Sequence, residues 1–216
     1  MSLHLENYLE HTLLRPNATQ AEIRQLCLEA MEHKFYGVCV HGSHTLFARY
    51  LLRGSGIRLI TVIGFPLGAN STESKVFEAQ DAVENGAEEL DMVMHAGALK
   101  QQDDAYVVHD IAQVKKAVGQ RTLKVIIESG VLDAAEIRKA CELAMAAGAD
   151  FIKTSTGFAA VGARLEDVKL IREVVGPDMG IKASGGIANR EAALEFLRAG
   201  ATRIGTSSGP VLLKTK

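Results

Sequence analysis

The sequence predicts an α/β protein: a single-domain parallel (β/α)8 TIM barrel that spans residues 1–216. Short apolar runs alternate with longer helical patterns from one end of the chain to the other, and the joints between them are short. One joint recurs, in which a helix end is followed by Gly-Ala, polar residues and an apolar run, as in NGAEELDMV, AGADFIKTS and AGATRIGTS. Eight such units in about 200 to 250 residues fit a closed barrel.

Eight short apolar runs bounded by polar or turn-forming residues are the predicted strands. An open doubly wound sheet is the alternative arrangement, but no GxGxxG motif follows the first strand. The glycine-rich turns instead follow the last two strands, which favours the barrel. In chain order, the predicted strands cover residues 11–13, 37–40, 59–63, 90–94, 123–127, 151–153, 180–183 and 203–205.

Helical periodicity fills the segments between these strands, and capping residues mark several helix ends. Thr19 with Glu22 and Asp133 with Glu136 have the spacing of a capping box, which predicts two helix starts. Glycine just past an apolar helical pattern predicts a helix end. The glycines in such positions are Gly86, Gly148 and Gly200.

The composition excludes several classes of partner. The net charge is -2 with both signs interspersed, so no basic stripe is available for nucleic acid and no polybasic helix for a membrane. The first residues lack the pattern of a signal peptide and no apolar run is long enough to span a membrane, so we expect a cytoplasmic protein. Its three cysteines are expected to be reduced and mostly buried; they are Cys27, Cys39 and Cys141.

Three lysines occupy matching places inside apolar strands: Lys124, Lys153 and Lys182. A buried ammonium loses its hydration, so it either gives up its proton easily and becomes a nucleophile, or pairs with a carboxylate. Lys153 and Lys182 lie on neighbouring strands about 5 Å apart, where their charges repel by about 3 kcal/mol at an effective dielectric constant of about 20. One of them should therefore lose its proton easily. A neutral amine can form a Schiff base with a carbonyl, as in Schiff-base aldolases.

Asp91 and Cys39 should join the three lysines at the C-terminal ends of the strands. Asp91 lies among apolar residues, and either shuttles protons or forms a structural salt bridge. Lys124 could pair with Asp91 or with Glu128, and we expect it to give electrostatic support rather than to act as the nucleophile. For Cys39, a buried or pocket-lining thiol is favoured over a nucleophile, because the sequence places no base beside it.

The predicted substrate-binding residues follow three of the strands. A polar cluster directly after Lys153 is suited to substrate hydroxyls, and glycine-rich loops after the seventh and eighth strands resemble the phosphate cradle of barrel enzymes. Ordinary turn chemistry is the alternative explanation for these loops. Together with Lys124, the predicted set is Thr154, Ser155, Gly157, Ser184, Gly185, Gly186, Gly205, Thr206, Ser207 and Ser208.

No metal site and no cofactor are predicted. His41 and His44 are three residues apart and His95 follows another strand, but there is no HExxH motif or comparable cluster. We interpret these histidines as residues of the surface or of the pocket rim.

The chain resembles the 2-deoxyribose-5-phosphate aldolase family over nearly its whole length. The motifs that carry the resemblance are HTLLRPNAT, VCV, TVIGFPLGA, ELDMVM, LKVIIESG, FIKTSTGF, IKASGGI and GTSSG, in this order. The resemblance implies a class I aldolase of deoxyribose phosphate catabolism. Such an enzyme reversibly cleaves 2-deoxy-D-ribose 5-phosphate into D-glyceraldehyde 3-phosphate and acetaldehyde without metal. An aldolase for another sugar phosphate and a non-catalytic sugar-phosphate binding barrel are the alternatives.

The resemblance also implies roles for single residues. Lys153 would form the Schiff base, Lys182 would ease its deprotonation by proximity, and Lys182 with Asp91 would relay protons. The sequence departs from the family pattern at Glu10, where Asp is common, and at His41, where Asn is frequent. It ends in VLLKTK without the terminal tyrosine that some members use, so water or another side chain would serve instead. A homo-oligomer, with a dimer as the simplest case, is expected.

Overall fold

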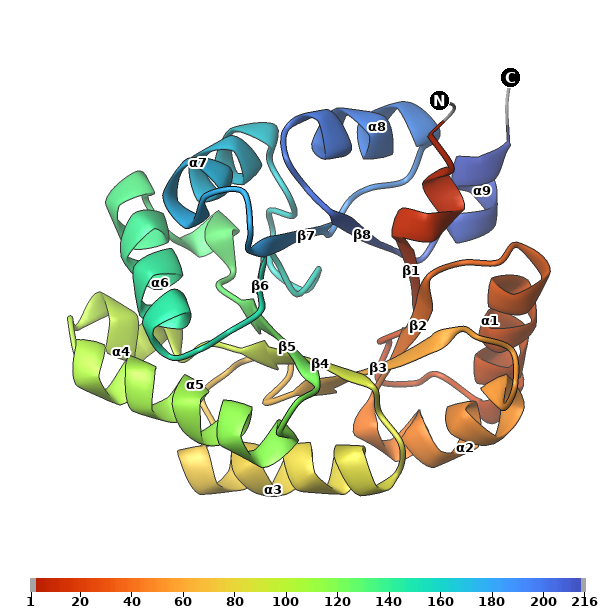
Figure 1. The fold of residues 1–216 in the computed structure, drawn as a ribbon, viewed down its shortest axis with the longest axis horizontal. Helices are drawn as coiled ribbons and strands as arrows, with labels where there is room; N and C mark the ends of the chain where they lie inside the picture. The colour runs from red at the N-terminus through yellow and green to blue at the C-terminus, as the bar shows by residue number, and fades with distance from the viewer. Residues whose placement is uncertain (1–2, 215–216) are drawn as a thin grey trace.

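Eight parallel strands close into a barrel in the computed structural model, which describes residues 3–214. Each strand pairs with the next along the chain, and β8 pairs with β1. Figure 1 shows the helices arranged in a ring around this barrel. The predicted (β/α)8 barrel is confirmed, and the open-sheet alternative is wrong. The strands are β1 (Leu9–Thr12), β2 (Gly37–Val40), β3 (Arg58–Ile63), β4 (Glu89–Val93), β5 (Thr122–Ile126), β6 (Phe151–Lys153), β7 (Gly180–Ser184) and β8 (Arg203–Thr206).

All eight predicted strands are present, and all but one of their ends agree with the prediction to within one residue. The largest difference is at β1, which begins at Leu9, two residues before the predicted start. The apolar pattern missed this start because Glu10, a carboxylate, is the second residue of the strand.

The helices begin and end largely where the capping residues predicted. Both capping boxes are formed, with Thr19 at the start of α1 and Asp133 at the start of α6. Gly86, Gly148 and Gly200 follow α3, α6 and α8 with positive φ angles, a conformation that favours glycine. The helices are α1 (Gln20–Glu32), α2 (Gly42–Leu52), α3 (Thr72–Glu84), α4 (Ala96–Lys100), α5 (Asp104–Val118), α6 (Ala134–Ala146), α7 (Leu165–Val175), α8 (Arg190–Arg198) and α9 (Gly209–Leu213), with short 3-10 turns η1 (Leu5–Tyr8) and η2 (Ser129–Val131).

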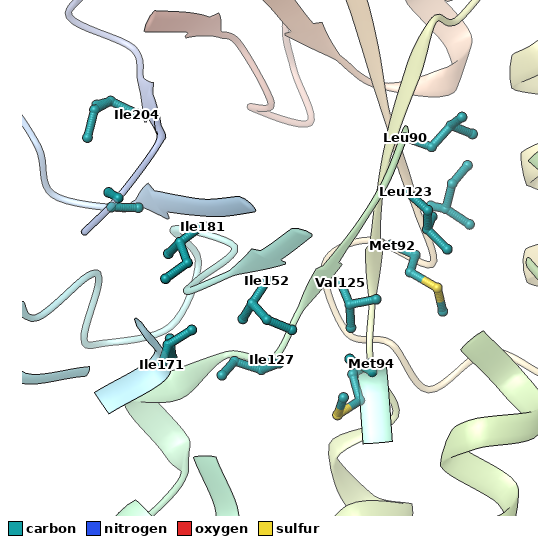
Figure 2. Packing of buried hydrophobic residues seen from close by; sticks show 14 of the residues in the cluster. Leu90, Met92, Met94, Leu123, Val125, Ile127, Ile152, Ile171, Ile181 and Ile204 are labelled. Atoms are coloured by element: carbon teal, nitrogen blue, oxygen red, sulfur yellow. The ribbon is translucent and has the colours of Figure 1, made fainter. Parts of the chain in front are cut away.

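The main hydrophobic core lies between the barrel and the surrounding helices. Figure 2 shows apolar side chains of β4 and β5, among them Leu90, Met92 and Val125, side by side in this layer. Successive strand residues point to opposite faces, so these positions alternate with residues that face the barrel interior. In β6, for example, Ile152 packs in the core while Phe151 and Lys153 face the interior.

The barrel interior contains few apolar side chains. Its small hydrophobic cluster is formed by Leu14, Cys39, Ile60 and Val62, with Phe65 packed against it. Many of the other interior positions carry ionisable groups, which are described below. Within residues 3–214, no helix combines the length and apolarity needed to cross a membrane.

Candidate active site

Asp91 is the centre of a buried cluster of charges at the barrel's interior. Lys124 Nζ lies 2.9 Å from Asp91 Oδ1. Lys153 Nζ and Lys182 Nζ both contact Asp91 Oδ2, at 2.9 Å and 2.6 Å. The predicted convergence of these four residues is therefore present in the structure, and the lysine–carboxylate pairs that the sequence left open are formed.

The register of the parallel strands brings these residues together. Asp91 is paired with Lys124 across β4 and β5, and Lys153 is paired with Lys182 across β6 and β7. Side chains with the same parity on neighbouring parallel strands point to the same face of the sheet. Asp91 and the three lysines thus share the interior face, and closure of the barrel turns that face into one small volume.

Two further carboxylates in this cluster were not among the predicted site residues. Glu10 is fully buried and pairs with Lys182, and its Oε1 lies 3.4 Å from Lys124 Nζ. Glu89 Oε2 lies 2.6 Å from Lys124 Nζ, and Tyr36 donates a hydrogen bond to Glu89. The signal for both was available, because each is an acid beside residues of an apolar strand.

The carboxylates and lysines fix one another's charge. Burial alone would raise the pKa of Asp91, but Lys124, Lys153 and Lys182 outweigh it and hold the pKa of Asp91 well below its usual value. Burial alone would lower the pKa of Lys182, but Asp91 and Glu10 outweigh it and raise that pKa. The pKa of Lys124 is raised in the same way. A buried lysine was expected either to pair with a carboxylate or to lose its proton easily. Lys124 and Lys182 follow the first of these alternatives.

A pocket of about 480 Å³ opens over this cluster at the C-terminal ends of the strands. Lys153 and Lys182 line it, so the cluster has access to a ligand through these two residues. Eight predicted substrate-binding residues also line it: Gly157, Ser184, Gly185, Gly186, Gly205, Thr206, Ser207 and Ser208. A larger groove of about 940 Å³ lies at the other end of the barrel, but it is lined by none of the cluster residues.

Three predicted substrate-binding residues do not line the pocket. Lys124 is fully buried and surrounded by Glu10, Glu89 and Asp91, a position that supports Asp91 but does not face a ligand. Of the two partners expected for Lys124, Asp91 is the one it contacts, whereas Glu128 accepts hydrogen bonds from Thr156.

Thr154 and Ser155 connect two strand ends instead of facing the pocket. Thr154 Oγ1 donates to the carbonyl of Ser184 over 3.3 Å, and Ser184 Oγ donates to the carbonyl of Ser155 over 2.6 Å. Both residues are fully buried. The polar cluster that we interpreted as hydroxyl-binding thus holds the end of β6 against the end of β7, and only its outer part reaches the pocket.

Three polar or aromatic residues of the pocket were missed in the sequence. Thr12 and Arg15 come from the end of β1 and the loop after it, and Phe158 from the loop after β6. Thr156, a member of the predicted polar cluster after Lys153, does line the pocket. The strand-end rule could have identified Thr12, because active-site residues of barrels lie at this end of the strands. The other two lie in loops, whose course the strand pattern does not determine.

Aromatic rings form one wall beside Lys153. The centroid of the Phe65 ring lies 6.0 Å from Lys153 Nζ. Phe158 and His41 both make edge-to-face contacts with Phe65, at centroid distances of 5.4 Å and 5.6 Å. His41 also hydrogen-bonds the carbonyl of Leu14 through Nε2, over 2.8 Å. These rings place apolar surface beside the Lys153 amine.

Glycine at two positions makes room for the site. A Cβ on Gly205 would lie 2.9 Å from Cε of Lys182, so glycine here lets the Lys182 side chain pass β8. Gly185 has a φ of 89°, and its carbonyl accepts a hydrogen bond from Ala163 N over 3.1 Å. The loop after β7 is thereby held against the loop after β6, and together they shape the pocket mouth.

Neither metal ligands nor a reactive thiol is found in the cluster. Residues 3–214 contain no group of three His, Cys, Asp or Glu side chains placed to hold a metal ion. Burial raises the pKa of the Cys39 thiol to about 11, although Lys182 opposes the shift. A thiol with this pKa is protonated near neutral pH, which disfavours Cys39 as a nucleophile.

A parallel barrel with lysines in a pocket at the C-terminal ends of its strands is the architecture of a Schiff-base enzyme. The family model described as DeoC/LacD family aldolase matches residues 9–213. The chain belongs to this family of aldolases.

Individual relatives agree with the family match. The chain is 54% identical to a deoxyribose-phosphate aldolase of Thermococcus kodakarensis, over 95% of this chain and 93% of the relative. It is 51% identical to a deoxyribose-phosphate aldolase of Macrococcus caseolyticus, over 98% and 96%. The tetrameric deoxyribose phosphate aldolase structure from Aeropyrum pernix matches with a TM-score of 0.88 and 34% identity, over 97% of this chain and 89% of that one.

Proposed function

We propose that this protein is a class I aldolase that reversibly cleaves 2-deoxy-D-ribose 5-phosphate into D-glyceraldehyde 3-phosphate and acetaldehyde. The observation that carries the proposal is the placement of Lys153, whose amine reaches the pocket and contacts Asp91 Oδ2 beside Lys182. The substrate assignment is supported by the family match and by the names of relatives at about half identity. Residues 1–216 are proposed to form one barrel domain.

Lys153 is the proposed nucleophile, because the charges of the cluster balance when it is neutral. Seven ionisable side chains meet in the interior: the carboxylates are Glu10, Glu89 and Asp91, and the basic groups are Lys124, Lys153, Lys182 and Arg203. If every group were ionised, one positive charge would be in excess. Of the lysines, Lys124 has three carboxylate partners and Lys182 has two, whereas Lys153 has one.

The reaction then follows from these positions. The neutral Lys153 amine attacks the C1 aldehyde of the open-chain sugar, and the carbinolamine loses water after a proton reaches its hydroxyl. The Lys182 ammonium is the proton donor, and the Asp91 carboxylate stabilises the iminium cation that results. The Lys182 amine, neutral after donating its proton, takes the proton of the C3 hydroxyl as the C2–C3 bond breaks. The electrons of that bond move into the iminium to form an enamine, and C3 becomes the aldehyde of the departing D-glyceraldehyde 3-phosphate. Protonation of C2 and hydrolysis of the imine then release acetaldehyde and restore Lys153.

Borohydride reduction tests this assignment. The folded protein is incubated with acetaldehyde and reduced, and its intact mass and peptide map are compared with those of a sample without aldehyde. We expect a mass increase of one reduced acetaldehyde on the peptide that contains Lys153. An adduct on Lys182 or Lys124 would overturn the role of Lys153 while keeping the aldolase, and no adduct on folded protein would favour a sugar-phosphate binding barrel.

A donor screen tests the substrate. Acetaldehyde, dihydroxyacetone and pyruvate are each supplied with D-glyceraldehyde 3-phosphate, and carbon–carbon bond formation is followed. The proposal expects product with acetaldehyde. Product with another donor alone would indicate an aldolase for a different sugar phosphate.

We also propose that the protein is a cytoplasmic homo-oligomer, with a dimer as the simplest case. Support comes from the Aeropyrum pernix relative, which is described as a tetramer. It also comes from exposed apolar side chains on the neighbouring helices α2 and α3. These residues are Leu46, Tyr50 and Phe77. Light scattering coupled to size-exclusion chromatography would give the mass of the assembly and test the proposal.

A further inference from the structure

The loops that would hold the substrate's phosphate carry no positive charge. Residues 184–188 read SGGIA and residues 205–208 read GTSS, and both segments line the pocket. In the described structure, the backbone N–H groups of Gly186, Ile187 and Ser207 donate to no protein acceptor, so they are free to bind an anion. Such a cradle offers directed donors but does not neutralise the charge of a phosphate.

Arg15 is the one cation that lines the described pocket besides Lys153 and Lys182. The two lysines are engaged with Asp91 at the reaction centre. In a sugar 5-phosphate that reacts at C1, the phosphate lies at the far end of the carbon chain. Lys153 and Lys182 therefore act at C1 and are too far along the substrate to pair with its phosphate. A cation for the phosphate must come from elsewhere on the pocket wall.

The backbone around Arg15 is fixed, while its side chain is held only at the surface. Leu13 N donates to the carbonyl of Cys39 over 3.0 Å, and Ala18 N donates to the carbonyl of Arg15 over 3.0 Å. The Arg15 side chain is 55% exposed, and it pairs with Glu22, itself 41% exposed, at 2.6 Å. It also donates a long hydrogen bond of 3.4 Å to Asn17 Oδ1. Exposed ion pairs contribute little to stability, so exchanging this partner has little cost.

Glu22 keeps its other role when Arg15 leaves. Arg15 binds Glu22 Oε1, whereas the backbone N–H and the hydroxyl of Thr19 donate to Glu22 Oε2 at 2.8 Å and 2.9 Å. The start of α1 is thus capped whether or not the ion pair is present. Glu22 can act as a resting partner that holds the guanidinium at the pocket mouth.

We propose that Arg15 is the cationic partner of the substrate's phosphate, and that its guanidinium exchanges Glu22 for a phosphate held in the glycine-rich cradle. This inference rests on the proposed function, because it takes the ligand to be a sugar phosphate. Guanidinium groups suit phosphate, since two N–H donors can bind two phosphate oxygens at once. Arg15 is therefore a specificity-determining residue for phosphorylated over unphosphorylated sugar.

The test compares two variants on two substrates. The value of kcat/KM is measured for 2-deoxyribose 5-phosphate and for 2-deoxyribose, in the wild type, in Arg15→Gln and in Glu22→Gln. We expect Arg15→Gln to reduce the preference for the phosphorylated sugar about tenfold, mainly through KM, as for loss of one charge-assisted contact. Glu22→Gln breaks the same ion pair but retains Arg15, so the preference should stay or increase.

Two outcomes would overturn the inference: an unchanged preference in Arg15→Gln, or an equal loss of preference in Glu22→Gln. A titration with inorganic phosphate, followed by ³¹P NMR, separates this inference from the proposed function. If the wild type turned over neither sugar, the aldolase proposal would fail. The phosphate titration would still decide about Arg15, because weaker phosphate binding in Arg15→Gln than in Glu22→Gln supports its role and equal binding refutes it.

Discussion

Lys153 and Lys182 share one oxygen atom, Oδ2 of Asp91, at 2.9 Å and 2.6 Å. Two ammonium groups on one carboxylate oxygen repel each other, and the repulsion disappears when one of them is neutral. Because Lys182 is also paired with Glu10, its cation is the better stabilised of the two. This geometry supports the proposal that Lys153 is the nucleophile and that Lys182 transfers protons.

Replacement of the nucleophile should separate activity from folding. We expect Lys153→Ala to reduce turnover on the order of 10⁴-fold or more. Among the described residues, Lys182 is the other lysine that lines the pocket, and its second carboxylate partner, Glu10, keeps it charged. Steady-state kinetics and circular dichroism melts are the measurements. A variant that unfolds, while Lys153→Met remains folded and active, would contradict the role of Lys153.

Replacement of Lys182 should change the pH dependence as well as the rate. Lys182→Ala should reduce kcat about 10²- to 10³-fold, because the proton donor is lost. The acidic limb of the kcat/KM profile should move to higher pH, since the positive charge that disfavours a second ammonium is also removed. The measurement is the pH profile of kcat/KM over about pH 5 to 9, around the range in which proteins are usually most stable. A reduced rate with an unmoved acidic limb would remove Lys182 from the tuning role.

Glu10 should influence the basic limb of the kcat/KM profile, which has to be followed to higher pH than this range because the pKa of Lys182 is raised above its ordinary value. Its negative charge raises the pKa of Lys182, so Glu10→Gln lowers that pKa and the basic limb should move to lower pH. Glu10→Asp keeps the charge and is the matched control, with a smaller displacement expected. Equal displacements in the two variants would show that side-chain length, and not charge, determines the effect.

Asp91 should stabilise the fold most near neutral pH. Its folded-state pKa is lowered, so its contribution is present above the unfolded-state value of about 3.9 and is lost as the pH falls through the folded-state pKa. Asp91→Asn should therefore cost about 3 to 5 kcal/mol of unfolding free energy at neutral pH, and less in acid. Urea unfolding at the two pH values is the measurement, and an equal cost at both would contradict this linkage.

A fourth buried lysine serves structure and not catalysis. Lys75 on α3 is fully buried, and its Nζ lies 2.6 Å from Asp110 Oδ2 of α5. We expect Lys75→Met to destabilise the protein by about 3 to 5 kcal/mol, because Asp110 is left without its cation in the core. The double variant Lys75→Met/Asp110→Leu should recover much of this loss in urea unfolding. If the double variant were as unstable as the single one, the ion pair would not be the cause.

Strand residues were predictable from the sequence because of their period. Alternation places Asp91, Lys124, Lys153 and Lys182 on one face, and short joints predict parallel strands, so their convergence follows. Lys75 was not recognised because a lysine in a helical pattern normally marks the exposed face. Arg15 was missed because it lies in a loop, where neither period applies.

The distinction between a residue in the pocket and one beside it also required the structure. Thr154 and Thr156 belong to the same polar run, but Thr154 is tied to Ser184 and only Thr156 reaches the pocket. Hydrogen bonds between strand ends decide this difference, and they depend on segments far apart in the sequence.

The alternation of side chains along β6 limits where residues can be inserted into the chain or deleted from it. Deleting one residue ahead of Lys153 would turn the amine outward into the helix layer and bring an isoleucine or a threonine into the charge cluster. The same holds for every strand that contributes to the cluster. Insertions and deletions are therefore tolerable in the loops but not in the strands, and attempts to reshape the substrate range should graft new loops onto strands of unchanged length.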